Sequence, residues 1–437
     1  MRISSVTFSP RQTQSALVAW TLMICGTGYA AEAPWQELQI QNRELRSQLQ
    51  TQQKQLDELR VQMERLTASQ ASSAAVSGST GNPAPRDGAD RKLVITGEFG
   101  FALFAGGNDD AYRNREFRID DANLRLEAAL GRDTYLFGEL QLAKREGLDE
   151  NFHLGEFYLE FENVSGAFGV PDRLLNVRLG RVDIPFGEEY QSRDPLTNPL
   201  ITHSLSDVWG TDEGVEVYGE FGRASYAFAV QNGSSKTTRD YNADKALTLR
   251  IGYEVTSQLH VSASAMRTGE LATAREPLSE VWIGNNVFRN IGSSSSTTHE
   301  ADLAEVDASY HWRTGRVAAA AGLARYRDND TLADNSRRFT YYQIETVQDL
   351  SRQIYGAVRF STLEVENGYP LAGIGNFSKY FLTALKTKEL QRWSLGGGFR
   401  FTPSLILKFD YTLENGKLTT GAARDHRLFS VESVLGF

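Results

Sequence analysis

The chain of 437 residues is poor in features that define large classes of protein. It has a single cysteine, Cys25, so a scaffold built on disulfides is excluded. After Ala31 no apolar run is long enough for a membrane-spanning helix, which excludes helical membrane proteins. The formal net charge is -9 and no basic block occurs, so we expect no nucleic-acid partner.

Motifs for catalysis are missing as well. No G-x-S-x-G occurs, and none of the six histidines pairs with a second one at metal-ligand spacing. His299 precedes a glutamate, but no histidine follows four residues later. Residues 233–237 (GSSKT) lack the first glycine and the helix of a phosphate-binding loop. We therefore expect no enzyme, no cofactor and no metal site.

The first 31 residues have the composition of a secretory signal peptide. Arg2 and Arg11 precede an apolar run over residues 16–24, and small residues follow up to Ala31. Cleavage after position 30 or 31 would remove the only cysteine. A lipoprotein signal at Cys25 is the less favoured alternative, because the preceding isoleucine is large where a small residue is needed.

Residues 32–66 show a heptad repeat. Two series of mostly apolar residues, each with a spacing of seven, lie three residues apart and occupy the a and d positions. This pattern predicts a coiled coil, and an amphipathic helix packed on its own domain is the alternative. Residues 67–91 are rich in Ser, Ala, Gly and Pro, which is typical of a flexible linker.

From position 92 to the end, the hydrophobic period changes to two. In residues 405–411 (LILKFDY), Leu405, Leu407 and Phe409 alternate with Ile406, Lys408 and Asp410, and similar segments recur along the chain. Short turns alternate with longer polar loops, which we place at residues 106–114, 185–214, 232–244, 268–300, 328–337, 366–389 and 414–425. Long loops at one end and short turns at the other are typical of outer-membrane barrels. We expect an all-β fold, an antiparallel transmembrane barrel of about sixteen strands over residues 92–437.

The chain ends on LFSVESVLGF, and the last residue is an aromatic on the apolar side of a period-two pattern. In a closed barrel the final strand must pair with the first, which would hold Phe437 in place. An aromatic at that position fits the interfacial girdle of a membrane barrel.

Residues 178–200 (RLGRVDIPFGEEYQSRDPLTNPL) resemble the phosphate-selective porin O and P family. The likeness lies in a strand that runs into Gly180-Arg181, then the IPFG stretch at 184–187, and the pairs Asp194-Pro195 and Asn198-Pro199. The barrel size and the coiled coil with its linker also fit that family. The resemblance implies an outer-membrane porin that assembles as a homotrimer, with the coiled coil in the periplasm. Small ions or solutes would diffuse through it; phosphate is one such anion, and the solute stays open.

The resemblance also implies that the third extracellular loop, at residues 185–214, folds into the pore as a constriction. The loop holds six acidic residues against one arginine, a balance of -5, which favours cations over phosphate. From it we select these constriction residues: Glu188, Glu189, Arg193, Asp194, Asp207 and Asp212. From the barrel wall we select Arg125, Arg178 and Arg250 as residues that would attract anions.

The sequence is also compatible with two other functions. The coiled coil could make the protein a structural tether between the outer membrane and the cell wall. A barrel enzyme is the least favoured alternative, because the chain has no recognisable nucleophile with a base and no metal motif.

Overall fold

The computed structural model describes residues 93–107, 112–144, 150–170, 174–233, 240, 243–272, 282–283, 286–287, 296–333, 335–370 and 386–437. These residues belong to one compact unit, which extends from Gly88 to Phe437. The predicted signal peptide, coiled coil and linker lie outside the described residues and stay predictions.

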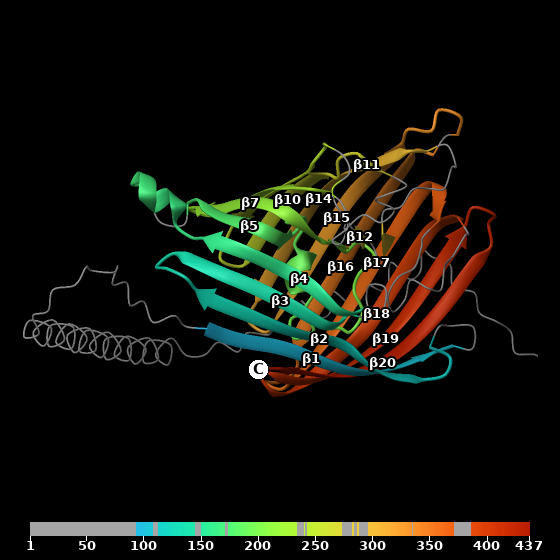
Figure 1. The fold of residues 1–437 in the computed structure, drawn as a ribbon. Coiled ribbons are helices and arrows are strands. Elements are labelled where there is room, and N and C mark those ends of the chain that lie inside the picture. The colour runs from blue at the N-terminus through green and yellow to red at the C-terminus, as the bar shows by residue number, and fades with distance from the viewer. Residues whose placement is uncertain are drawn as a thin grey trace, which may run out of the picture. The chain divides into compact units, whose positions relative to one another are not determined.

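Sixteen long strands form one closed antiparallel barrel, as the alternating pattern predicts (Figure 1). Each strand pairs with its neighbours along the chain, and β1 pairs with both β2 and β20, which closes the sheet. The strands are β1 (Leu93–Gly106), β2 (Glu116–Ala129), β3 (Thr134–Lys144), β4 (Glu150–Phe161), β5 (Asn176–Asp183), β7 (Thr211–Phe221), β8 (Ala224–Gln231), β9 (Ala246–Glu254), β10 (Leu259–Arg267), β14 (Thr298–Trp312), β15 (Gly315–Asp328), β16 (Arg337–Asp349), β17 (Ile354–Pro370), β18 (Lys386–Thr402), β19 (Leu405–Leu418) and β20 (Ala423–Gly436).

Smaller elements lie in the connections. Strand β11 (Leu271–Ala272) extends the sheet beside β14, and β6 (Val208–Trp209), β12 (Trp282–Ile283) and β13 (Asn286–Val287) form a separate three-stranded sheet. Among the described residues, the helical elements are the short 3-10 turns η2 (Val164–Phe168) and η3 (Glu189–Ser192). In the part of the chain that the structure describes, no helix is both long and apolar enough to cross a membrane.

The C-terminal strand is hydrogen-bonded to the first strand, as the sequence predicts. Phe437 donates a backbone hydrogen bond to Gly97 and accepts one from it, both at 3.0 Å. Figure 1 shows β20 and the C-terminus beside β1. The pairing between the first and last strands, which closes the barrel, therefore extends to the last residue of the chain.

The barrel is apolar on the outside and polar on the inside. In β19, Leu407 and Phe409 expose 41% and 52% of their surface, whereas Lys408 and Asp410 between them expose 1% each. This is the reverse of a water-soluble protein, in which charged residues are rarely buried. It is the arrangement expected when the outer face contacts lipid and the inner face lines an aqueous lumen.

Two predicted loops are shorter than expected. The interval 414–425 is mostly strand, because the β19–β20 ladder continues to the pair Lys417–Ala423 and leaves only residues 419–422 as a turn. Similarly, β17 extends to Pro370 and β18 begins at Lys386. The polar composition at these positions indicated loops, but paired strands can be polar on both faces where they rise above the apolar band.

Candidate functional site: the third loop inside the barrel

The connection between β5 and β7, residues 184–210, is the third at its end of the barrel, after the β1–β2 and β3–β4 connections. It contacts the inner face at widely separated strands. Asp194 pairs with Arg125 of β2 at 2.7 Å, and Glu188 pairs with Arg250 of β9 at 2.7 Å. Because these partners stand on opposite parts of a closed wall, the loop crosses the inside of the barrel.

The second half of the loop is bound to β17, β18 and β19 through polar contacts. Asp410 accepts hydrogen bonds from the backbone N–H groups of Ile201 (3.3 Å) and Thr202 (3.0 Å). Arg359 donates to the carbonyl of Thr202 at 2.6 Å, and Arg392 donates to the carbonyl of residue 203 at 2.9 Å. These charged side chains satisfy backbone groups of the loop that would otherwise be buried without partners.

Apolar contacts hold the same half of the loop. Leu200 lies in a buried cluster with Tyr355 and Ile406 of the wall, and Leu205 is fully buried in another cluster with Tyr341. Burial of a leucine side chain contributes about 1.5–3 kcal/mol. Apolar and charged side chains of the inner wall thus alternate along the stretch where the loop adheres to it.

The first half of the loop, with η3, separates two cavities. The β2–β5 cavity measures about 210 Å³ and is lined by residues of strands β2 to β5. The β14–β17 cavity measures about 180 Å³ and is lined by residues of strands β14 to β17. Gln191 of η3 lines both cavities, so this short helix stands between two open spaces inside the barrel.

The predicted acidic residues of the loop are bound by several partners. Glu188 faces Arg250 and also lies 3.4 Å from His260. Glu189 accepts hydrogen bonds from the backbone and hydroxyl of Ser204 (3.1 and 2.5 Å) and from Gln343 (2.8 Å). The excess negative charge of the loop is therefore partly balanced by basic and polar groups of the wall.

Arg193 and Asp207 form an ion pair within the loop, and Asp207 is fully buried. This pair links the end of η3 to the residue that precedes β6. Arg193, the one arginine among the predicted constriction residues, is consequently engaged by a carboxylate of its own loop.

Asp212 is not part of the loop, and its predicted place was wrong. It lies on β7 opposite Val182 of β5, where it accepts hydrogen bonds from the backbone N–H groups of Glu213 and Gly233. The ladder between β5 and β7 begins at the pair Asp183–Thr211, so the strand starts before the sequence pattern suggested.

The three wall arginines all face inward and bind carboxylates. Arg125 pairs with Glu98 (3.0 Å), Glu139 (2.9 Å) and Asp194. Arg250 binds the loop through Glu188 and lies over the ring of Tyr190 at 5.7 Å from its centroid. Burial raises the pKa of the Tyr190 hydroxyl, so it stays neutral beside this arginine.

Arg178 lies apart from the loop. It pairs with Glu160 of β4 at 2.9 Å and with Glu216 of β7 at 3.1 Å, and its guanidinium lies over the ring of Tyr218. The structure therefore brings Arg125 and Arg250 to the loop but leaves Arg178 in a network of the wall.

The sequence did not single out Asp410, Arg392 or Glu345 as site residues. Glu345 binds Arg316 at 2.7 Å and also pairs with Arg359. The period-two pattern places Asp410 on the inward face of its strand, but nothing in the pattern shows which inward residues bind the loop.

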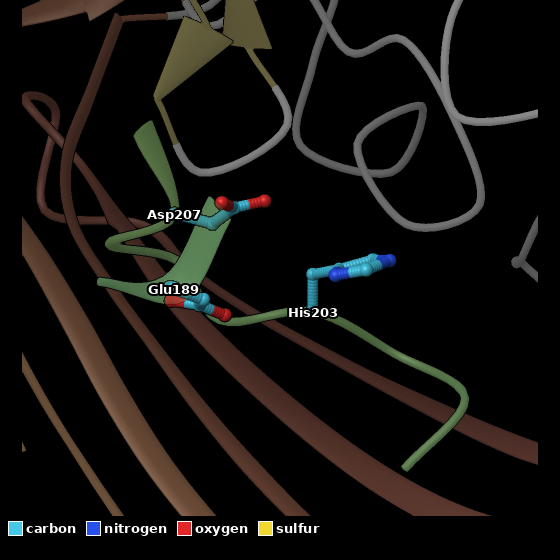
Figure 2. A group of neighbouring side chains, drawn as sticks. All are labelled: Glu189, His203 and Asp207. Carbon is cyan, nitrogen blue, oxygen red and sulfur yellow. The ribbon is translucent and has the colours of Figure 1, made fainter. Parts of the chain in front are cut away.

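Figure 2 shows Glu189, His203 and Asp207, three loop residues whose ligand atoms lie within 4.8 Å of one another. This combination of residue types can hold a metal ion. In this structure Asp207 already pairs with Arg193, and Glu189 is hydrogen-bonded to Ser204. Two of the three side chains therefore already have partners within the loop.

Comparisons with known proteins add the fold class. No family model matches the sequence, and no curated protein matches it. Among solved structures, the outer membrane channel DcaP of Acinetobacter baumannii has 11% identity and a TM-score of 0.55 over 82% of this chain and 100% of that one. The anion-selective porin from Comamonas acidovorans has 11% identity and a TM-score of 0.53 over 79% and 100%.

OmpT of Vibrio cholerae, solved as a trimer form, has 10% identity and a TM-score of 0.50 over 79% of this chain and 99% of that one. These likenesses cover nearly the whole length of the solved proteins and the described barrel of this chain. The chain therefore has the barrel fold of outer-membrane porins.

Proposed function

We propose that the chain is an outer-membrane channel through which small water-soluble ions and solutes diffuse. The observation that carries this proposal is the closed barrel with an apolar outer face, a charged inner face and a loop across its interior. The polar interior and the two cavities beside η3 support a water-filled lumen through which solutes diffuse.

The first half of the third loop forms the constriction in this proposal. Glu188, Glu189, Arg193 and Asp194 lie on or beside η3, between the two cavities, and Asp207 holds Arg193 in place. Asp212, on β7, belongs to the wall. The narrowest part of the path thus carries more carboxylates than guanidinium groups.

Membership of the phosphate-selective porin O and P family is part of the proposal and rests on the stretch at residues 178–200. Strong selectivity for phosphate is not part of it. Phosphate-binding pores present arginine and lysine side chains to the anion. Here Arg125, Arg178, Arg193 and Arg250 are each bound to carboxylates.

We further propose a homotrimer in the bacterial outer membrane, with the predicted coiled coil in the periplasm. The trimer form of a protein with the same fold supports the oligomeric state. The heptads of residues 32–66 would align the chains. A contact with the cell wall through this coiled coil remains the alternative function, as a structural tether.

Planar lipid bilayer recording tests the channel directly. Purified protein should insert in discrete steps and give an ohmic conductance that scales with salt concentration. A purely structural tether would insert without any current. Protein that is heat-modifiable on gels, and therefore folded, but gives no current would contradict the proposed function.

A further inference from the structure

Glu189, His203 and Asp207 bring three potential metal ligands together inside the third loop (Figure 2). Glu189 begins η3, His203 lies in the middle of the loop, and Asp207 directly precedes β6. Each residue offers one ligand atom, and the three atoms lie within 4.8 Å of one another. Small movements of the side chains would give all three the distance of about 2.0–2.2 Å that zinc takes to nitrogen and oxygen ligands. The ligand atoms therefore converge on one position.

The types of ligand in this group select a class of metal. One imidazole and two carboxylates are ligands that Zn²⁺ and related transition metals accept, whereas Mg²⁺ and Ca²⁺ favour sites made of oxygen alone. The sequence predicted no metal site, because no two histidines have metal-ligand spacing. A site with a single histidine depends on how the loop folds, which the spacing does not show.

A second observation concerns the carboxylate of Asp207, which is fully buried. Arg193 contacts its Oδ2, but Oδ1 accepts no hydrogen bond in the part of the chain that the structure describes. A buried carboxylate oxygen without a donor costs free energy, which a metal ion would recover. Arg193 also lines the β2–β5 cavity, so its guanidinium can turn further into that space when a metal binds Asp207.

The other two residues are held in position from outside the group. Glu189 accepts hydrogen bonds from Gln343 of β16 and from Ser204, and its Oε1 accepts only the one from the Ser204 backbone among the described residues. The carbonyl of His203 accepts a hydrogen bond from Arg392 of β18 at 2.9 Å. Hydrogen bonds that orient the ligands in this way are typical of metal sites in proteins.

We propose that Glu189, His203 and Asp207 bind one divalent transition-metal ion of the Zn²⁺ class, which links the beginning, the middle and the end of the third loop. Water would complete the tetrahedral set that zinc prefers. The site goes beyond the proposed channel function, because metal binding can be measured on the folded protein without any current.

Isothermal titration calorimetry with ZnCl₂ tests the site. The protein is purified in detergent without a histidine tag and is freed of metal with EDTA, which is then removed. The wild type should bind one zinc ion per chain. His203→Gln should weaken this binding more than about tenfold, because it removes the only nitrogen ligand of the group. Asp207→Asn keeps the shape of its side chain, removes one anionic ligand, and should weaken binding similarly.

His311→Gln is the matched control. His311 is exposed on β14 and is not part of the group, so its loss removes an imidazole of the kind that binds zinc adventitiously. Zinc binding should stay within about twofold of the wild type in this variant. Heat-modifiable migration on gels shows that each variant is folded before it is compared. Absence of zinc binding in the wild type, or equal binding in His203→Gln and His311→Gln, would overturn the site.

X-ray absorption at the zinc edge identifies the ligands of the bound ion. The wild type should show nitrogen and oxygen ligands at about 2.0–2.2 Å with the scattering signature of an imidazole. This signature should disappear in His203→Gln and persist in His311→Gln. Zinc that keeps the same spectrum in His203→Gln is bound elsewhere, which would overturn the site. Protein that binds zinc in this way but conducts no ions would contradict the channel function alone.

Discussion

Asp410 of β19 accepts hydrogen bonds from both the backbone and the hydroxyl of Thr202, at 3.0 and 2.6 Å, across 208 residues of sequence. A single carboxylate of the wall thus holds the middle of the third loop. Because Asp410 is 1% exposed, the contact is shielded from water and its hydrogen bonds are of the strong, charge-assisted kind.

Replacement of Asp410 should therefore loosen the loop. Asp410→Ala removes the three hydrogen bonds to Ile201 and Thr202, at a cost of about 3 kcal/mol or more in the attachment of the loop. We expect a noisier current with frequent transitions to a higher conductance in single-channel records. Asp349→Ala, at an exposed ion pair with Arg400, is the control. Equal noise in both variants would argue that Asp410 does not hold the loop.

Arg125 should limit the preference of the pore for cations. It balances Glu98, Glu139 and Asp194, so Arg125→Gln leaves three carboxylates facing the lumen without a basic partner at this position. The ratio of potassium to chloride permeability, measured from the reversal potential in a salt gradient, should rise. Arg400→Gln, near the β18–β19 turn, should change it little. A fall of the ratio in Arg125→Gln would contradict this account.

The acidic residues around η3 should increase the preference of the pore for cations, which Arg125 limits. Neutralising Glu188, Glu189 and Asp194 together should shift the reversal potential toward anions. The shift should shrink at high salt, because the Debye length falls from about 10 Å at 0.1 M to about 3 Å at 1 M. A wild-type channel that conducts chloride well and is blocked by micromolar phosphate would show that the wall arginines dominate.

The barrel should migrate differently on gels before and after boiling, because a closed barrel resists unfolding by detergent at room temperature. Cross-linking of the unboiled protein in detergent should give a band of three chains. Deletion of residues 32–66 should weaken this band and leave the heat-modifiable monomer intact. Cross-linking that yields only single chains would remove the trimer from the proposal.

The sequence predicts the barrel well because the local alternation of apolar and polar residues shows which side chains of a strand face outward and which face inward. In β19 the alternation alone identifies Lys408 and Asp410 as inward residues. It cannot show that Asp410 meets Thr202, because that contact depends on how the loop folds across a lumen formed by distant strands. The misplacement of Asp212 has a similar cause: its polarity indicated a loop, and pairing with β5 made it strand.

The loop charge is another property that the sequence alone could not settle. Counting residues gave a strongly acidic segment, but Glu188 and Asp194 each meet a wall arginine that lies 62 and 69 residues away in sequence. The local excess is consequently smaller than the composition suggested.

Chemical modification at η3 tests the central claim, that this segment lines the path of permeating ions. Gln191 is exposed and lines both cavities, and the chain after Ala31 contains no cysteine, so Gln191→Cys introduces a single thiol into the predicted mature protein. A positively charged methanethiosulfonate reagent should reduce the single-channel conductance of this variant and leave the wild type unchanged. Complete modification, verified by mass spectrometry, with an unaltered conductance would contradict the account.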